Sequence, residues 1–161
     1  MGKIVLTRID SRLIHGQVMT KWVNQSQANR IIIVSDELAN DEFMKAVYLM
    51  SAPEGIQIDC FTEKETVEKF KENEFGDGKI LLLLPGLTPL KNIVDEGVQL
   101  QEVQIGGLGG APNRKTVYQN ITLDDIDAQT IRYLLDHSVN VYFQIIPEDA
   151  PQKGEDILKK Y

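Results

Sequence analysis

The chain of 161 residues has one cysteine, one tryptophan, two histidines and no long hydrophobic run. A single cysteine excludes a disulfide framework within the chain and fits a reducing, cytoplasmic setting. The longest apolar run, residues 80–85, has the length of a strand and is too short to span a bilayer. The first ten residues are too polar for a secretion signal, so we expect a cytoplasmic protein.

Positive charge is also scarce, because 17 Lys and Arg oppose 24 Asp and Glu, giving a net charge of −7. This balance argues against nucleic acid or an anionic membrane as the main partner. The first 30 residues differ, since they carry a net charge of +4 from five cations and one aspartate: Lys3, Arg8, Arg12, Lys21, Arg30 and Asp10. A small anion site or an acidic partner would account for this excess, as would chance asymmetry over a short window.

Apolar patterning along the chain alternates between strand-like and helix-like stretches. Strands are expected at 3–9, 30–35, 56–61, 79–84, 102–105 and 140–146, with an extended segment at 116–121. Helices are expected at 15–28, 40–50, from 62 to about 75, at 90–96 and at 123–138, with a short, loosely packed helix after residue 147. The alternation predicts a single α/β domain over residues 1–161, with an open, twisted, mostly parallel sheet of six or seven strands and helices on both faces.

In such folds, functional residues gather in the loops at the carboxyl ends of the strands. Four loops therefore matter most: residues 10–15, 36–40, 85–89 and the glycine-rich stretch 106–110. Asp36 ends the second strand, where it is either peripheral to a site or a helix cap. The glycine-rich stretch has the wrong spacing and place for dinucleotide binding, and we expect it to be a flexible loop near His15.

The segment Thr7–Val18 reads TRIDSRLIHGQV and places one of the two histidines between a strand and a helix. Backbone N–H groups at a helix start attract anions, and Arg12 can grip phosphate or carboxylate oxygens with paired donors. Gly16 leaves the imidazole accessible, and Asp10 can fix which ring nitrogen is the nucleophile. These features together predict that His15 is a nucleophile able to carry a phosphoryl group.

Several neighbours of His15 have two interpretations each. Arg8 and Asp10 either take part in the phosphate site or form an ordinary ion pair at the strand end. Ser11 is either a helix cap or a hydroxyl that contacts phosphate. Gln17 is either a phosphate-site residue or only a first-turn helix residue.

The segment Arg8–Val18 closely resembles the phosphorylation-site signature of the IIB subunits of the mannose/fructose/sorbose class of the sugar phosphotransferase system. The resemblance continues through most of the chain, in residues 21–23, 30–42, 52–55, 96–98 and 103–108. It implies a cytoplasmic phosphocarrier, peripherally associated with a membrane transporter. A IIA phosphohistidine would phosphorylate His15, on Nδ1 by family precedent, and the membrane IIC and IID subunits would present the sugar that receives the group. Arg12 would stabilise the phosphate.

Two segments depart from the mannose-type pattern, residues 84–89 and 109–115. In residues 84–89, Thr88 supplies the hydroxyl that we expect beside the phosphate. Neither segment identifies the sugar. We expect no cofactor and no metal, since the sequence has no nucleotide-binding P-loop and no obvious metal-ligand cluster.

The same residues suggest two other functions. A non-catalytic regulatory protein could use the same anion pocket to bind a phosphometabolite or an acidic partner. A phosphatase or mutase is disfavoured, because no second histidine or carboxylate pair is placed as a general acid. His137, at a helix end, and Cys60, on a strand, are expected to be structural. Pairing of two copies through an exposed apolar surface stays open.

Overall fold

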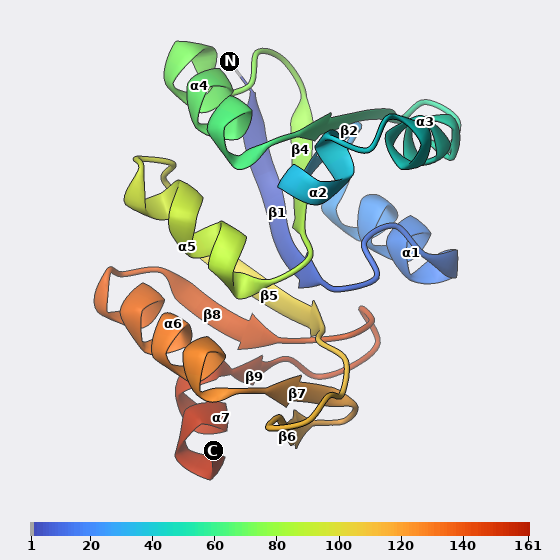
Figure 1. The fold of residues 1–161 in the computed structure, drawn as a ribbon. Helices are drawn as coiled ribbons and strands as arrows, with labels where there is room; N and C mark the ends of the chain where they lie inside the picture. The colour runs from blue at the N-terminus through green and yellow to red at the C-terminus, as the bar shows by residue number, and fades with distance from the viewer. Residues whose placement is uncertain (1) are drawn as a thin grey trace.

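The computed structural model describes residues 2–161 (Figure 1). Its strands are β1 (Lys3–Asp10), β2 (Arg30–Val34), β3 (Gln57–Phe61), β4 (Lys79–Leu84), β5 (Glu102–Gly107), β6 (Lys115–Tyr118), β7 (Ile121–Leu123), β8 (Asn140–Phe143) and β9 (Gln152–Lys153). Its helices are α1 (Gly16–Ser26), α2 (Asp36–Ala39), α3 (Glu42–Met50), α4 (Glu63–Asn73), α5 (Leu87–Asp95), α6 (Asp125–Asp136) and α7 (Gly154–Lys160).

Seven strands form one sheet in the order β3-β2-β4-β1-β5-β8-β9. All neighbouring pairs are parallel except β8 and β9, which confirms the predicted mostly parallel α/β sheet. The extended segment expected at 116–121 is instead a two-stranded antiparallel hairpin of β6 and β7, apart from the main sheet. The long connections between parallel strands place helices on both faces of the sheet.

The apolar core lies on both sides of the sheet. One cluster joins alternate residues of β2 and β4, such as Ile31 and Leu83, to α1 and α2. The other joins the residues in between, such as Ile32 and Leu82, to α5 and α6. Because successive strand residues point to opposite faces, a strand buried on both sides must be apolar throughout. The uninterrupted runs RIIIV and KILLLL are therefore central strands.

Helix starts follow local capping chemistry. A capping box of Thr62 and Glu65 opens α4, where a helix was expected from residue 62. The single helix expected over residues 40–50 is wrong in its start, because α2 ends at Ala39, Asn40 follows it, and α3 begins at Glu42. Ser35 caps α2 and Asp41 caps α3 through bonds from backbone N–H groups. The apolar spacing of the sequence does not reveal α2, because a helix of four residues is too short to show a helical period.

The C-terminal segment is better packed than the sequence suggests. Ile157 in α7 is fully buried, and β9 adds a short antiparallel strand beside β8. The expectation of a loosely packed tail is therefore wrong. A single buried isoleucine carries little sequence signal, yet burying such a side chain contributes about 1.5–3 kcal/mol.

Candidate functional site

The site lies at the carboxyl end of β1, which is central in the sheet with β4 on one side and β5 on the other. From β1 the chain runs through α1 to β2 on the β4 side, and β5 later joins on the opposite side. Such a change of direction opens a crevice above the strand ends, where ligands bind in α/β folds. Asp10 is the last residue of β1 and His15 directly precedes α1 (Figure 1).

His15 and Asp10 are in direct contact. The imidazole Nε2 lies 2.9 Å from Oδ2 of Asp10, whose side chain is fully buried, while the His15 side chain is 20% exposed. A carboxylate can only accept a hydrogen bond, so Nε2 carries the proton in this arrangement. The other nitrogen, Nδ1, then keeps its lone pair and is the nucleophilic atom of the ring.

Asp10 is fixed by two arginines as well as by His15. Arg8 Nη2 lies 3.3 Å from Oδ2, and the backbone N–H of Arg12 donates to Oδ1 at 3.1 Å. Arg12 Nε also lies 3.5 Å from Oδ1, but the Arg12 side chain is 54% exposed. The backbone of Arg12 thus belongs to the framework, whereas its guanidinium is accessible to an anion in solution.

Arg8 is fully buried, and its Nη atoms contact protein groups on every side. Besides Asp10, they donate to the Gln104 side chain and to the carbonyls of Gln144 and Ile145 at 3.1 and 3.0 Å. Burial lowers the pKa of the guanidinium while Asp10 acts to raise it, and arginine stays charged in either case. This placement does not support a direct phosphate contact by Arg8. It makes Arg8 the anchor of the carboxylate that orients His15.

Trp22 covers the other side of that anchor. Its ring lies 5.3 Å from Arg8 Cζ, and its Nε1–H donates to the Ile145 carbonyl at 2.8 Å. Gln104 and Trp22 were not among the residues expected at the site. Gln104 is distant from His15 in sequence and reaches Arg8 through the pairing of β1 and β5, whereas Trp22 lies two turns into α1 and reaches Arg8 through the packing of that helix.

Two glycines of β5 make room for the buried ion pair. A Cβ atom on Gly106 would lie 2.0 Å from Arg8 Cζ, and one on Gly107 would lie 2.6 Å from Asp10 Oδ1. The Gly107 carbonyl also accepts the backbone N–H of Ser11 at 2.8 Å. The expectation of a flexible glycine-rich loop is therefore wrong for these two residues, which end a buried strand. Only their neighbours from Gly109 onward belong to the loop.

The remaining loop residues surround His15 without contacting its ring. Ser11, Gly16 and Gln17 are exposed, and the Ser11 hydroxyl caps no helix. Gly16 has φ of +49°, a conformation that favours glycine, and open space where a side chain would be. Leu13 also has a positive φ, of 58°, and its N–H donates to the Asp10 carbonyl at 2.9 Å. This tight turn brings His15 back over Asp10.

Asp36 and Thr88, predicted from neighbouring strand ends, have different surroundings. Asp36 accepts a hydrogen bond from the Glu63 N–H at 2.7 Å, so it links α2 to the start of α4. Helix α5 begins at Leu87 rather than at the expected residue 90, so Thr88 lies in its first turn. The Thr88 side chain is exposed there. Because Leu84 pairs with Ile9, this first turn follows the strand end beside Asp10.

Two helix starts adjoin the site with no side-chain cap. Neither His15 before α1 nor Gly86 before α5 makes a capping hydrogen bond, whereas α2, α3, α4 and α6 are all capped by side chains. Helix α7 also starts without a side-chain cap, but α1 and α5 are the ones that follow β1 and its neighbour β4, and they cover opposite faces of the sheet. Their free N–H groups and dipoles favour an anion between them.

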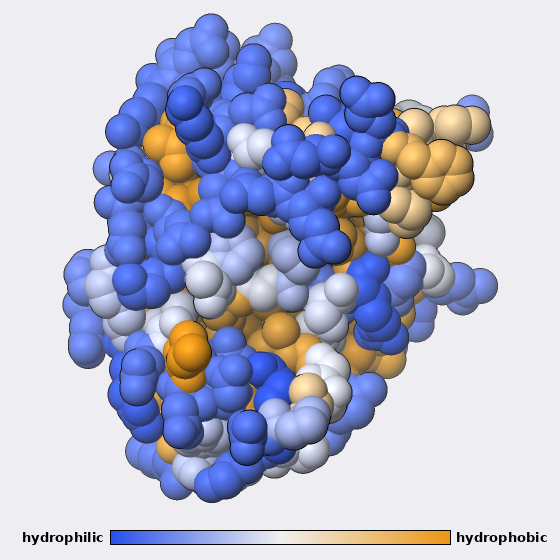
Figure 2. All heavy atoms as spheres, viewed as in Figure 1, coloured by the Kyte–Doolittle hydropathy of each residue, from blue (hydrophilic) through white to orange (hydrophobic). Residues whose placement is uncertain are grey.

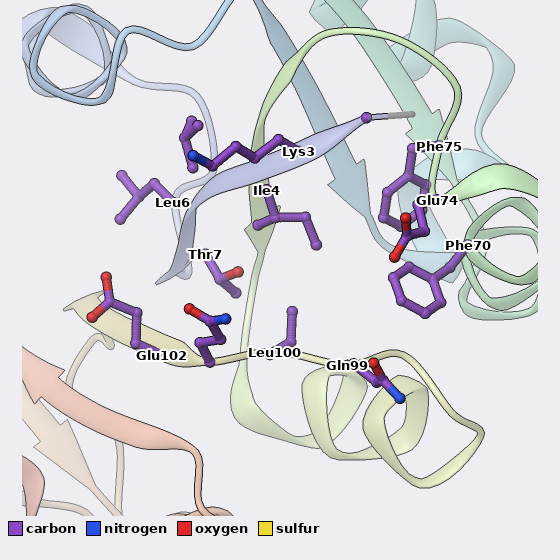
Figure 3. Close-up of a pocket in the computed structure, with 13 residues that line it drawn as sticks. Lys3, Ile4, Leu6, Thr7, Phe70, Glu74, Phe75, Gln99, Leu100 and Glu102 are labelled. Atoms are coloured by element: carbon purple, nitrogen blue, oxygen red, sulfur yellow. The ribbon is translucent and has the colours of Figure 1, made fainter.

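A cavity lies elsewhere in the molecule. It has a volume of about 550 Å³ and opens between the first half of β1 and the segment that leads into β5 (Figure 3). Ile4, Thr7, Phe70 and Leu100 line it, so it adjoins the amino ends of these strands. His15 follows the carboxyl end of β1, and the cavity contains no histidine or cysteine. It is therefore separate from the Asp10–His15 site.

Residues 2–161 contain no cluster of three or more His, Cys, Asp or Glu side chains placed to bind a metal ion. Within the same residues no helix has the length and apolar character needed to cross a membrane. Cys60 is buried, and burial raises the pKa of its thiol to about 11. His137 makes a 2.7 Å contact between Nδ1 and the Tyr133 carbonyl at the end of α6, which leads into the amino end of β8, whereas His15 follows the carboxyl end of β1.

A histidine oriented by a buried carboxylate, above a parallel sheet and beside helix starts without side-chain caps, places an imidazole nitrogen next to an anion site. The sequence profile described as "PTS system sorbose subfamily IIB component" matches residues 4–161. The chain belongs to this family of the phosphotransferase system. It is thus a phosphocarrier subunit of the sugar phosphotransferase system and has phosphotransferase activity as its function.

Individual relatives agree with this assignment. The sorbose-specific EIIB component of Klebsiella pneumoniae is 31% identical over 91% of this chain and 90% of that protein. The crystal structure of the IIBSor domain of the sorbose permease from the same organism has a TM-score of 0.92 at 30% identity, over 98% of this chain and 97% of that one. The structure of manxB from Thermoanaerobacter tengcongensis has a TM-score of 0.92 at 36% identity, over 100% and 98%.

Proposed function

We propose that His15 is the residue of this IIB subunit that carries the phosphoryl group. A IIA protein donates the group from its own phosphohistidine, and His15 passes it to a sugar held by the membrane IIC and IID subunits. The observation that carries this proposal is the 2.9 Å contact between His15 Nε2 and the buried Asp10 carboxylate. In the neutral imidazole, that contact places the proton on Nε2, so that Nδ1, on the other side of the ring, has the lone pair.

In the first step, the Nδ1 lone pair attacks the phosphorus atom, and the N–P bond to the donor histidine breaks. Asp10 stabilises the positive charge that develops on the imidazole. In the second step a sugar hydroxyl attacks phosphorus, the Nδ1–P bond breaks, and the hydroxyl proton is released. The sugar becomes a phosphate ester and His15 returns to its starting state.

Charge neutralisation and positioning do most of the work in phosphoryl transfer. The exposed guanidinium of Arg12 and the free amides of α1 supply donors for the phosphate oxygens. The first turn of α5, with the Thr88 hydroxyl, is the second source of donors. A carrier must also release the group, and contacts that are partly open to water bind phosphate less tightly than fully buried ones.

The direct test uses phosphoenolpyruvate, the general phosphotransferase proteins and the cognate IIA protein. We expect an acid-labile, alkali-stable phosphoryl label on the wild-type protein and none on His15→Ala. The fold of the variant is checked by circular dichroism, and His137→Ala serves as the matched control that keeps its label. A label that survives in His15→Ala would overturn the assignment. A wild-type protein that takes no label would favour a regulatory anion-binding role.

Peripheral association with the membrane follows from the same proposal, through the IIC and IID subunits. No nucleic acid is expected as a partner of a chain with a net charge of −7.

A further inference from the structure

Helix α3 exposes an apolar surface. Five of its nine residues are large apolar side chains that are 37% to 85% exposed, and we call them the α3 patch: Phe43, Met44, Val47, Leu49 and Met50. Figure 2 shows the group as an apolar protrusion beside a mostly hydrophilic surface. Within α3, the partly buried Tyr48 packs on the core and no residue is fully buried. Contiguous apolar surface of this kind marks interaction sites in soluble proteins.

The patch lies on the same side of the sheet as the helix that follows His15. Leu13 and Val18, which flank His15, share one core cluster with Tyr48 of α3. Figure 1 shows the start of α1 and helix α3 on the same side of the molecule. A protein that transfers a phosphoryl group to His15 must bring its own reacting atom to about 3–3.5 Å, so it must cover the surface around that residue.

The charges around the patch select among possible partners. Exposed carboxylates border it in α2, at the start of α3 and in the turn after α3, whereas α3 itself has one cation, the partly buried Lys45; the carboxylates are Asp36, Glu37, Asp41, Glu42 and Glu54. A second copy would bring a second set of carboxylates to the same interface, at a cost in free energy. An anionic membrane leaflet would also be repelled by these groups.

We propose that the α3 patch docks the soluble protein that donates the phosphoryl group to His15. The partner surface has an apolar centre that receives Phe43 and Met50, and a rim of Lys and Arg that faces the carboxylates. Charged rims of this kind raise association rates, while buried apolar anchors supply most of the binding free energy. The inference rests on the proposed function, because it assigns a surface to the donor of the same site.

The test is the double variant Phe43→Gln/Met50→Gln. Both side chains are at least 75% exposed, so their replacement should leave the fold intact. With phospho-IIA as donor, we expect the KM for His15 phosphorylation to rise about tenfold, while kcat stays the same. Phosphoramidate, a small donor that needs no docking surface, should label both proteins at the same rate. Ile126→Gln is the matched control, since Ile126 is 62% exposed on α6, which covers the other sheet face.

Three outcomes would overturn the proposal. The first is an unchanged KM for phospho-IIA in the double variant. The second is a loss confined to sugar phosphorylation from protein that is already phosphorylated, which would assign the patch to the membrane subunits. The third is a wild-type dimer in sedimentation that the double variant abolishes, which would assign it to a second copy. If the proposed function itself is wrong, the result is different, because wild-type His15 would then take no label from phospho-IIA or from phosphoramidate.

Discussion

At the scale of single residues, the site is a chain of contacts from a buried arginine to an accessible imidazole. Arg8 holds Asp10, and Asp10 holds His15, at 3.3 and 2.9 Å. Arg8 and Asp10 are both fully buried, so each needs the other to offset the cost of leaving water. The sequence leaves two alternatives for Arg8 and Asp10, an ion pair at the strand end or a role in the site. In the structure the ion pair holds the carboxylate that contacts His15, so the two alternatives describe one arrangement.

Asp10→Asn removes the charge that stabilises the His15 imidazolium and allows the wrong tautomer. We expect phosphoryl transfer from phospho-IIA to slow by about 10²–10⁴-fold. We also expect the free energy of unfolding to fall by about 3 kcal/mol, because Arg8 is left buried without its carboxylate. Rapid-quench labelling and urea unfolding measure the two effects.

Asp59→Asn is the matched control for this variant. Asp59 on β3 pairs with Arg30 on β2 at 2.8 Å, and two strands, β2 and β4, separate β3 from β1, so this ion pair shares the chemistry but not the site. Its loss should leave the rate of His15 phosphorylation unchanged. Equal effects of the two substitutions on that rate would contradict a specific role for Asp10.

At the scale of elements, β5 shapes the site although its side chains do no chemistry there. Gly106 and Gly107 of this strand have no side chains, and the space is filled by Arg8 and Asp10 of the neighbouring β1. Glycine within a strand weakens it, so its presence often marks a close approach of other atoms. That signal was readable in the sequence, but the partner atoms were not.

Gly106→Ala should therefore be strongly destabilising. The new Cβ would lie 2.0 Å from Arg8 Cζ in a fully buried region, so the guanidinium must move away from Asp10. We expect the free energy of unfolding to fall by about 2–4 kcal/mol and the rate of His15 phosphorylation to fall with it. Gly109→Ala is the control, since its Cβ would have no atom within 4 Å. Similar stability of the two variants would refute the packing argument.

At the scale of the whole molecule, protonation of buried groups links pH to unfolding. Cys60 is 2% exposed, and burial raises the pKa of its thiol from an ordinary value of 9.0 to about 11. Between these pH values the unfolded chain releases the thiol proton and the folded protein keeps it. Since the native state then binds more protons, the free energy of unfolding contributed by this group falls as pH rises from 9 to 11.

A pH series of urea unfolding experiments tests this. The wild-type protein should lose at most about 3 kcal/mol more stability than Cys60→Ala over that range. Trp22 fluorescence follows unfolding, and tyrosine and lysine titration cancels in the comparison. Parallel stability curves for the two proteins would show that Cys60 is not the group responsible.

Local patterns predicted much of this molecule. Uniform apolar runs gave the central parallel strands, because a strand buried on both faces admits few polar residues. The short spacing of Asp10, Arg12, His15 and Gly16 predicted a nucleophile with an anion site, since one tight turn keeps these groups close. The domain boundaries expected at 1–161 and the roles of individual site residues stay predictions.

The tertiary structure decided what depends on residues distant in sequence. It placed Gln104 and the carbonyls of the 144–145 segment around Arg8, so that of the two interpretations left open for this residue the structure favours a buried ion pair that anchors Asp10. It also left Phe43 and Met50 in solvent, although their spacing on α3 is that of a core-facing helix. Periodicity reports that a helix has an apolar face, but only the packing of the other elements decides whether this protein or a partner covers it.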